Sequence, residues 1–302
     1  MTMKSINFVV LGDASIANDL GKKGAVTDIT FYERKASDKI FSFIVPSGFP
    51  EKMQALVQSI SLAEYAIVNV KSIDKNLGEQ IVALDCMKMQ KGFILANGFD
   101  EDVKKIIKST SLESYEFVTA DELKQRIDSV EPVSIDGNTK VVLDAAFEVK
   151  GVGTVALGVV RRGTLKKYDE MEMFPQNKGV IIRSIQMHDD DVDSAVSPGR
   201  VGLALKGTEA KEMSRGDVIG TKGSLKVSSE VPVNFEKSKF YRGEVGTGSG
   251  YHICAGLQIR PARLDGGKII SDKPIAFESG DRIVVLDLNS SSVRVVGSGT
   301  VL

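Results

Sequence analysis

The chain has 302 residues, of which 42% are hydrophobic and 26% charged, and its formal net charge is −1. This length exceeds what one hydrophobic core usually serves, so two or three domains are expected; the near-zero charge argues against a polybasic nucleic-acid-binding protein and leaves room only for a local basic stripe that holds an RNA backbone. No apolar run approaches the roughly 20 residues that span a bilayer, so we expect a soluble, cytoplasmic protein without a membrane partner. We also expect no DNA partner.

Residues 1–130 alternate short apolar runs with segments of helical periodicity, which is typical of an α/β domain around a mostly parallel sheet. The runs predicted as strands are Ile6–Leu11, Phe41–Val45, Ala66–Val70, Phe93–Ala96 and Glu116–Val118. Apolar residues recur at helical spacing from Met53 to Ile60 and from Val103 to Ile107, so we expect helices packed on the sheet. Lys22 and Lys23 are expected to be solvated charges at a helix C-terminus.

The pattern changes near Glu131-Pro132, because proline favours an extended linker and the rest of the chain is rich in strand and turn signals. We place one β domain at residues 131–224 and a second at residues 225–302. In the second β domain, the predicted strands include Leu225–Val233, His252–Ile259 and Asp281–Leu288. The glycine-rich piece Gly243–Gly250 is predicted to be a mobile loop.

Four segments of the first β domain form a specific sequence motif. They are Phe147-Glu148-Val149-Lys150-Gly151-Val152-Gly153-Thr154-Val155, Ser184-Ile185-Gln186-Met187-His188, Gly199-Arg200-Val201-Gly202-Leu203-Ala204-Leu205-Lys206-Gly207 and Arg215-Gly216-Asp217-Val218-Ile219. In order and spacing this stretch resembles the second domain of translation elongation factors of the EF-Tu and SelB family, and the whole chain is most similar to the SelB-like paralogues of methanogenic archaea. The resemblance implies a degenerate P-loop-GTPase-like parallel sheet followed by two antiparallel β-barrels.

The first domain departs from this family where a phosphate would bind. A working GTPase follows its first strand with GxxxxGK[ST], whose amides and lysine hold phosphate. Here Gly12 and Asp13 follow the strand, and counting from Gly12 puts Ala17-Asn18-Asp19 where the family has Gly, Lys and Ser or Thr. A better alignment takes Ser15-Ile16-Ala17 as the start of the helix that follows the loop, so most of the phosphate loop is deleted. The family's Asp-x-x-Gly-His corresponds to Val45-Pro46-Ser47-Gly48-Phe49, so only Gly48 remains.

The family's guanine-reading Asn-Lys-x-Asp survives in part as Asn97-Gly98-Phe99-Asp100, and Val118-Thr119-Ala120 resembles the loop behind the base. Asp100 could still pair with guanine. Asn-Gly followed by Asp is also common turn chemistry, in which Asp100 would cap the helix that holds Val103 and Ile106. We favour this second interpretation.

The resemblance implies an amino-acid pocket for aminoacyl-tRNA on the first barrel, and Asp144 and Arg200 match its residues. Ala145 stands where selenocysteine-specific factors have a second arginine. Elsewhere on this barrel, Arg161-Arg162 and Lys166-Lys167 flank a glycine turn, either to contact an RNA backbone or to form a solvated hairpin tip.

We therefore predict a pseudo-GTPase with a degenerate nucleotide site at Gly12, Asp13, Gly48, Asn97 and Asp100. It would have no catalytic residue, no metal site and no cofactor, since the GTP and Mg²⁺ expected for the family would be lost. Its partners would be tRNA or aminoacyl-tRNA, the ribosome or a translation protein. Two alternatives stay open. One is a GTP-binding elongation factor with an atypical nucleotide site, and the other is a protein-interaction scaffold that uses apolar residues around Ile29, Val45 and Phe49.

Overall fold

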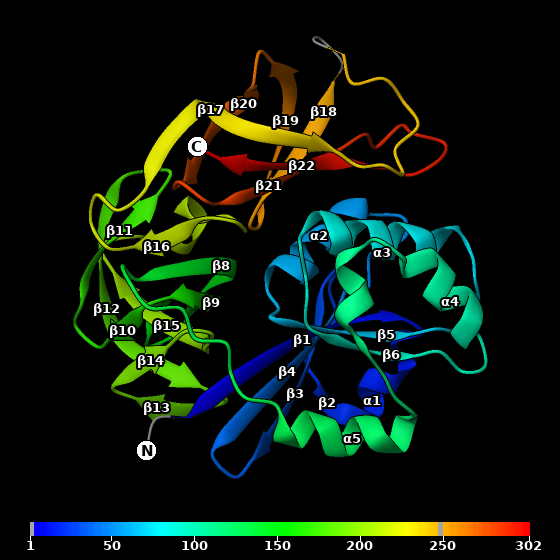
Figure 1. The fold of residues 1–302 in the computed structure, drawn as a ribbon. Helices are drawn as coiled ribbons and strands as arrows, with labels where there is room; N and C mark the ends of the chain where they lie inside the picture. Colours follow the sequence, from blue (N-terminus) through cyan, green and yellow to red (C-terminus); the bar gives the residue numbers. More distant parts are fainter. Residues whose placement is uncertain (1–2, 247–249) are drawn as a thin grey trace.

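The computed structural model describes residues 3–246 and 250–302 and shows three lobes, each with its own sheet (Figure 1). The sheet of the first lobe has the order β2-β3-β4-β1-β5-β6-β7. Its strands are β1 (Lys4–Gly12), β2 (Lys22–Lys23), β3 (Thr30–Ala36), β4 (Lys39–Val45), β5 (Tyr65–Asn69), β6 (Gly92–Leu95) and β7 (Glu116–Phe117). Strands β4, β1, β5, β6 and β7 run parallel, whereas β2 and β3 form an antiparallel extension at one end. The predicted α/β domain is confirmed.

Helices cover both faces of this sheet because successive residues of β1 point to opposite sides. The longer helices are α2 (Met53–Ser61), α3 (Lys75–Cys86), α4 (Asp100–Ile107) and α5 (Ala120–Ser129), and a short α1 (Ala17–Leu20) follows β1. Val9 and Leu11 pack in a core with α2, α3 and α4. Phe8 and Val10 pack with α1 and α5, where the Phe8 and Phe43 rings stack 5.5 Å apart between centroids.

The second lobe is a ring of six strands in the order β11-β16-β8-β9-β15-β12, which the pairing of β11 with β12 closes. These strands are β8 (Lys140–Val149), β9 (Gly153–Arg162), β11 (Glu170–Phe174), β12 (Lys178–Met187), β15 (Arg200–Lys206) and β16 (Val218–Gly220). Strand β13 (Asp190–Val192) extends β12, while β10 (Thr164–Lys166) pairs with β14 (Ser194–Val196). Inward side chains such as Val141, Leu143 and Ile182 form the core.

The third lobe is a closed barrel in the order β17-β20-β19-β18-β21-β22. Its strands are β17 (Lys226–Lys237), β18 (Tyr251–Ala255), β19 (Gln258–Asp265), β20 (Lys268–Phe277), β21 (Arg282–Leu286) and β22 (Val295–Val301). The two predicted antiparallel barrels are therefore confirmed. The helices of the described residues include none that is long and apolar enough to cross a membrane.

Three sequence-based expectations need correction or fall outside the structure. His252–Ile259 is not one strand, because the chain turns at Gly256, which has φ +60°, and pairs Cys254 with Ile259 across a hairpin. Lys22 and Lys23 form the edge strand β2 beside β3, since Gly21 ends α1 in an extended conformation. The loop prediction for Gly243–Gly250 falls partly on residues 247–249, which lie outside the described residues.

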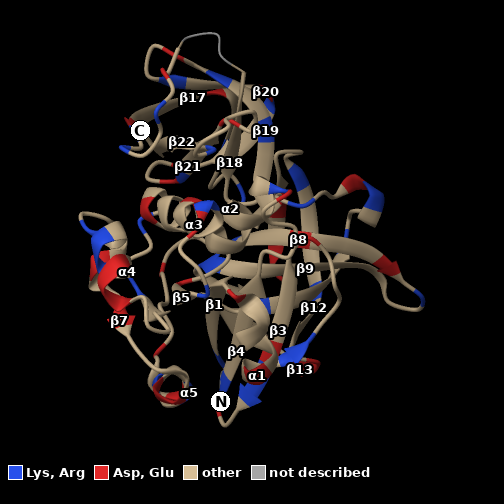
Figure 2. Cartoon of the chain, turned by 90° about the vertical axis from the view of Figure 1, so that its right-hand side faces the viewer, with Lys and Arg blue, Asp and Glu red and all other residues tan. Residues whose placement is uncertain are grey.

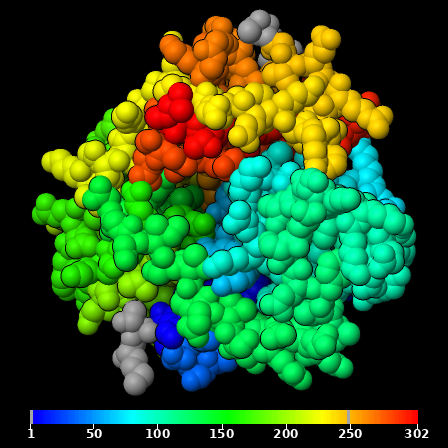
Figure 3. Space-filling model, viewed as in Figure 1, coloured from blue at the N-terminus to red at the C-terminus, as the bar shows by residue number. Residues whose placement is uncertain are grey.

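Ion pairs join the lobes, which touch one another around the centre of the molecule (Figure 3). Arg161 of the second lobe pairs with Glu64 of the first, and Arg162 reaches Glu278 of the third lobe at 2.6 Å. Lys140 of β8 lies 2.7 Å from Asp281. Arg161 and Arg162 therefore tie lobes together, in place of the RNA contact or solvated tip that the sequence suggested.

Candidate functional site

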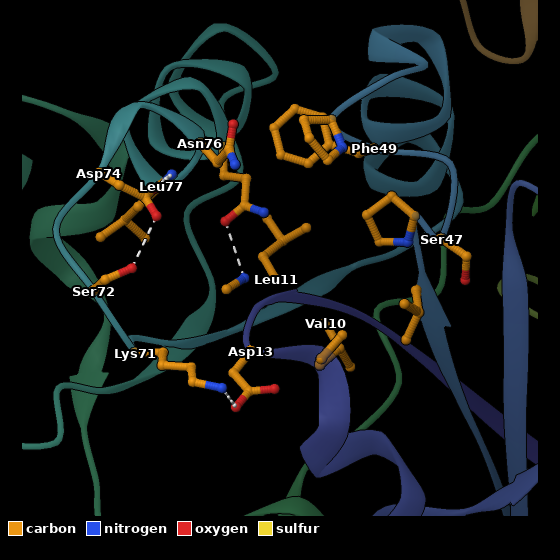
Figure 4. Close-up of a pocket in the computed structure, with 16 residues that line it drawn as sticks. Val10, Leu11, Asp13, Ser47, Phe49, Lys71, Ser72, Asp74, Asn76 and Leu77 are labelled. Carbon is orange, nitrogen blue, oxygen red and sulfur yellow. Dashed lines mark hydrogen bonds and ion pairs between the residues drawn. The ribbon is translucent and has the colours of Figure 1, made fainter.

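A pocket of about 390 Å³ lies at the carboxyl ends of β1, β4 and β5 (Figure 4). Gly12 and Asp13 border it at the end of β1, Ser47 follows β4, and Lys71 comes shortly after β5. Ligands of open α/β sheets bind at this edge, where the chain crosses from one side of the first strand to the other. Topology therefore marks this pocket as the first candidate site.

Internal partners occupy the backbone N–H groups at the start of this pocket. The Gly12 N–H donates to Oε1 of Gln80 at 2.9 Å, and the Asp13 N–H donates to the carbonyl of Asn69 at 2.8 Å. The Asn69 side-chain amide donates in return to the Asp13 carbonyl at 2.9 Å. The pocket thus offers an anion no free amide from Gly12 or Asp13, although such amides are what a phosphate site needs.

A negative charge stands beside these amides. The Asp13 carboxylate accepts a hydrogen bond from the Ser15 N–H at 3.0 Å and lies 3.6 Å from the Lys71 ammonium. The hydrogen bonds from Ser15, followed by the charge of Lys71, hold the pKa of Asp13 below its ordinary value. Asp13 caps a short 3₁₀ turn, Ala14–Ile16, so the chain enters helical geometry without a wide loop.

Gly48 lies in the loop after β4 at the same pocket edge. Its N–H donates to the carbonyl of Asp28 at 2.8 Å, and a Cβ added at Gly48 would lie 2.9 Å from the Asp28 Cβ. The glycine is therefore explained by the close approach of the two loops. Ser47 donates to the Thr30 hydroxyl at 2.8 Å, which further joins this loop to β3.

The backbone conformation at position 12 favours glycine, so a larger residue there should destabilise the protein. Its φ is +74°, and a Cβ there would lie 2.0 Å from the Asn69 carbonyl oxygen. Gly12→Ala is expected to lower the free energy of unfolding by about 2–5 kcal/mol, from left-handed strain and overpacking together. Gly98 has φ +92° with open space around its Cβ position, so Gly98→Ala should cost only the strain, about 1–2 kcal/mol. Equal losses in urea unfolding would contradict this account of Gly12.

A second pocket of about 310 Å³ contains Asn97, Gly98 and Asp100 together with Thr119 and Ala120. The Asn97 side chain donates to Oδ1 of Asn69 and to the Val70 carbonyl, both at 2.9 Å. Asn69 therefore connects this pocket to Asp13 in the first. Sequence reasoning missed Asn69 and Gln80, which lie 56 and 68 residues along the chain from their partners, and no local pattern identifies them.

The expected capping role of Asp100 is wrong. Phe99 is the N-cap of α4 and makes no side-chain capping bond, whereas Asp100 is the first helical residue. Glu122, also at this pocket, accepts hydrogen bonds from the Thr119 N–H and hydroxyl, which lower its pKa. The first turns of α4 and α5, which border this pocket, are rich in acidic residues (Figure 2). Its polar character is thus anionic.

Asp144 and Arg200 meet on the second lobe, as β8 and β15 bring them together. Two guanidinium nitrogens of Arg200 bind the Asp144 carboxylate, one of them at 3.1 Å, and the side chains are 13% and 10% exposed. Strand β3 of the first lobe lies against the pair, since the Phe31 ring is 4.0 Å from the Arg200 guanidinium carbon. A second guanidinium is close, because Arg215 Nε donates to the Asp144 carbonyl at 3.4 Å, and the sequence analysis had not singled it out.

The sequence is similar to translation elongation factors. Residues 153–220 match the family model "Elongation factor Tu domain 2". The chain is 34% identical to the uncharacterized protein MJ0325 of Methanocaldococcus jannaschii, over 94% of this chain and 95% of that protein. The selenocysteine-specific elongation factor of the same organism is 30% identical over 210 residues, which cover 60% of this chain and 45% of that protein.

The fold has a solved counterpart. The translation elongation factor SelB of Methanococcus maripaludis, in complex with the GTP analogue GppNHp, superposes with a TM-score of 0.86 over 100% of this chain and 79% of that chain. The sequence identity is 22%, so this likeness concerns the fold. The apo form of the same factor gives a TM-score of 0.83.

Proposed function

The chain belongs to the EF-Tu/SelB-type family of translation elongation factors, and from this premise we propose that it works in translation without a nucleotide switch. In this proposal the first lobe is a pseudo-GTPase and the two barrels bind tRNA or a translation partner constitutively. The observation that carries it is the internal use of the Gly12 and Asp13 amides, which makes these two N–H groups unavailable to a phosphate.

The energetics support the loss of nucleotide binding. Each hydrogen bond to a charged phosphate is worth roughly 1.5–3 kcal/mol, and about 1.4 kcal/mol changes affinity tenfold. Opening the Gly12 amide would also leave the Gln80 acceptor unpaired in a buried position. The Asp13 carboxylate would repel a phosphate, and no lysine stands at the family's P-loop position.

The first barrel, in the second lobe, offers the tRNA-binding candidate. By their resemblance to the family, Asp144 and Arg200 would hold the amino-acid end of an aminoacyl-tRNA, and Arg215 adds a second guanidinium near them. Such planar donors suit carboxylate, phosphate and stacked groups. The pair is mostly buried against β3, so the pocket is narrow and its amino-acid specificity is left to experiment.

Filter binding to charged and uncharged tRNA tests the proposal. We expect saturable binding that does not change when GTP and Mg²⁺ are added. A lack of binding to any tRNA or ribosome fraction would remove the main support for the proposal. Binding that requires GTP would instead support the alternative of a GTP-dependent elongation factor.

Arg200→Gln is expected to weaken tRNA binding about tenfold, because one charge-assisted hydrogen bond is worth roughly 1.5–3 kcal/mol. The double variant Asp144→Asn with Arg200→Gln avoids an unpaired buried carboxylate and should show the same loss. Arg183→Gln is the matched control, since Arg183 is exposed on the same barrel and binds only the Val152 carbonyl among the described residues. Equal binding by all variants would exclude Arg200 from the tRNA pocket.

One observation favours the GTP-dependent alternative. Asn97 and Asp100 still share a pocket with Thr119 and Ala120, as a base site of this family would require. The scaffold alternative loses its motivation, because Ile29 and Val45 are 3% and 8% exposed and Phe49 is half-buried. Those residues belong to the core and present no continuous apolar surface.

A further inference from the structure

Two arginines from the barrels hold two neighbouring loops of the first lobe. The loop from Pro46 to Pro50 after β4 lines the pocket, and the loop that contains Asp28 lies next to it. The loops are joined directly, since the Gly48 N–H donates to the Asp28 carbonyl at 2.8 Å. Whatever holds one loop therefore also restrains the other.

Arg294 of the third lobe holds the loop after β4. Its Nη1 donates to the Pro50 carbonyl at 2.8 Å, and its guanidinium carbon lies 5.7 Å from the Phe49 ring centroid. The remaining nitrogens bind Glu79 on α3, with Nε–Oε1 at 3.0 Å and Nη2–Oε2 at 2.5 Å. The Arg294 N–H also donates to Glu79 Oε1 at 3.0 Å. One residue thus joins the third lobe to both α3 and the pocket loop.

Burial makes this contact costly to open. The Glu79 side chain is fully buried, and a buried carboxylate is tolerated only when it is paired and hydrogen-bonded. Among the described residues, all of its recorded hydrogen bonds come from Arg294. Separation of the first and third lobes would leave that charge alone, so this interface favours a single arrangement.

Arg215 of the second lobe holds the other loop. Its Nη1 lies 2.8 Å from Asp28 Oδ2, with both side chains less than a third exposed. The hydrogen bond from Arg215, and next its charge, lower the pKa of Asp28 against the opposing effect of burial. Arg215 also reaches the Asp144 carbonyl at 3.4 Å, so the same residue borders the candidate tRNA pocket.

We propose that Arg294 and Arg215 are positioning residues that fix the loop after β4, the Asp28 loop and the three lobes in one closed arrangement, in place of a bound nucleotide. In nucleotide-switched GTPases, contacts of the γ-phosphate and Mg²⁺ order the corresponding loops. Here cationic side chains from the neighbouring lobes act on the loops from outside the pocket. The inference rests on the proposed function, because a site that still bound nucleotide would not need this replacement.

Distances between spin labels test the proposal on the full chain. Lys105→Cys on α4 with Asp265→Cys on the third lobe reports one interface, and Lys105→Cys with Lys150→Cys reports the other; all three positions are exposed. The native Cys86 and Cys254 are buried and poorly accessible to the label. Both pairs should give one narrow distance in the parent protein, unchanged by GTP and Mg²⁺.

Arg294→Met with Glu79→Gln removes the third-lobe contact without leaving a lone buried charge, and Arg215→Gln removes the second-lobe contact. Each is expected to move part of the population to a longer distance at its own interface only. Lys268→Met with Glu230→Gln is the matched control, because this exposed pair lies within the third barrel. We call the Arg294–Glu79 and Arg215–Asp28 contacts the clamp. A folded clamp variant that keeps the narrow parental distance would overturn the proposal.

These distances distinguish the lack of a nucleotide switch from the role of the two arginine contacts. If GTP and Mg²⁺ sharpen or shift the parental distances, the proposed lack of a nucleotide switch is wrong. The proposal that the clamp replaces a bound nucleotide is then wrong as well. If the parent ignores nucleotide and the clamp variants also keep parental distances, only the clamp fails. Should Arg294→Met with Glu79→Gln not fold, Arg215→Gln, which leaves an Asp28 with solvent access, supplies the decisive measurement.

Discussion

Calorimetric titration with GTP and Mg²⁺ is expected to give no saturable heat up to about 1 mM nucleotide, which corresponds to binding weaker than about −4.1 kcal/mol. The expectation follows from the amide pairs at Gly12 and Asp13 and from the Asp13 carboxylate at the same point. A phosphate would have to break both hydrogen bonds to use these two amides, and it would approach the Asp13 carboxylate as it did so.

The control for this titration is the Methanococcus maripaludis SelB, whose structure contains the GTP analogue GppNHp. Asp13→Asn separates charge from geometry in the present chain. It should also remain without heat, since Gln80 and Asn69 still occupy the amides. A micromolar site in the parent protein would instead establish a GTP-binding elongation factor with an atypical nucleotide site.

At pH 8, where Glu64 is ionised, its loss is expected to destabilise the protein by about 3–5 kcal/mol, the usual cost of breaking a buried charge pair. Glu64 lies between α2 and β5, with its side chain 6% exposed, and pairs with Arg161 of the second lobe. It also accepts hydrogen bonds from Asn7, through the backbone N–H at 3.2 Å and the side-chain amide at 3.0 Å. Glu64→Ala would leave these donors and the Arg161 charge without their acceptor.

The same residue predicts how stability depends on pH. Burial raises the pKa of Glu64 from 4.5 to about 7, although Arg161 and Asn7 act to lower it. Between these values the folded state binds more protons at this site than the unfolded state. The contribution of Glu64 is therefore fully present below pH 4.5 and is lost as the pH rises towards 7, with a slope of at most about 1.4 kcal/mol per pH unit.

Urea unfolding of the parent and of Glu64→Gln from pH 4.5 to pH 8 measures both effects. The Gln variant cannot titrate at this position, so its curve should lack the decline that the parent shows. Glu230→Gln, which removes an exposed acid from a surface pair, is expected to follow the parent. An identical pH slope in the parent and Glu64→Gln would show that Glu64 does not titrate in this window.

Much of the fold could be predicted from the sequence because its signals are local. Short apolar runs identified the five parallel strands between Ile6 and Phe117, and the sequence motifs around Gly151 and Gly199 identified the barrel family. The errors occurred where two local signals competed. At Gly256 the apolar residues continue through a turn, so periodicity alone joined two strands into one.

For the candidate site too, the sequence shows some features and only the tertiary structure shows the others. The sequence by itself determined that GxxxxGK[ST] is missing after Gly12, since that depends on residues present in one short segment. It could not determine that Gln80 and Asn69 take the Gly12 and Asp13 amides, or that Arg161, Arg215 and Arg294 join the lobes. Those partners lie tens to hundreds of residues apart, and an arginine has the same local pattern whether it faces solvent, RNA or a buried carboxylate. Only the packing of the three lobes decides which of these environments each charge occupies, because burial and the nearest opposite charge are properties of the folded arrangement.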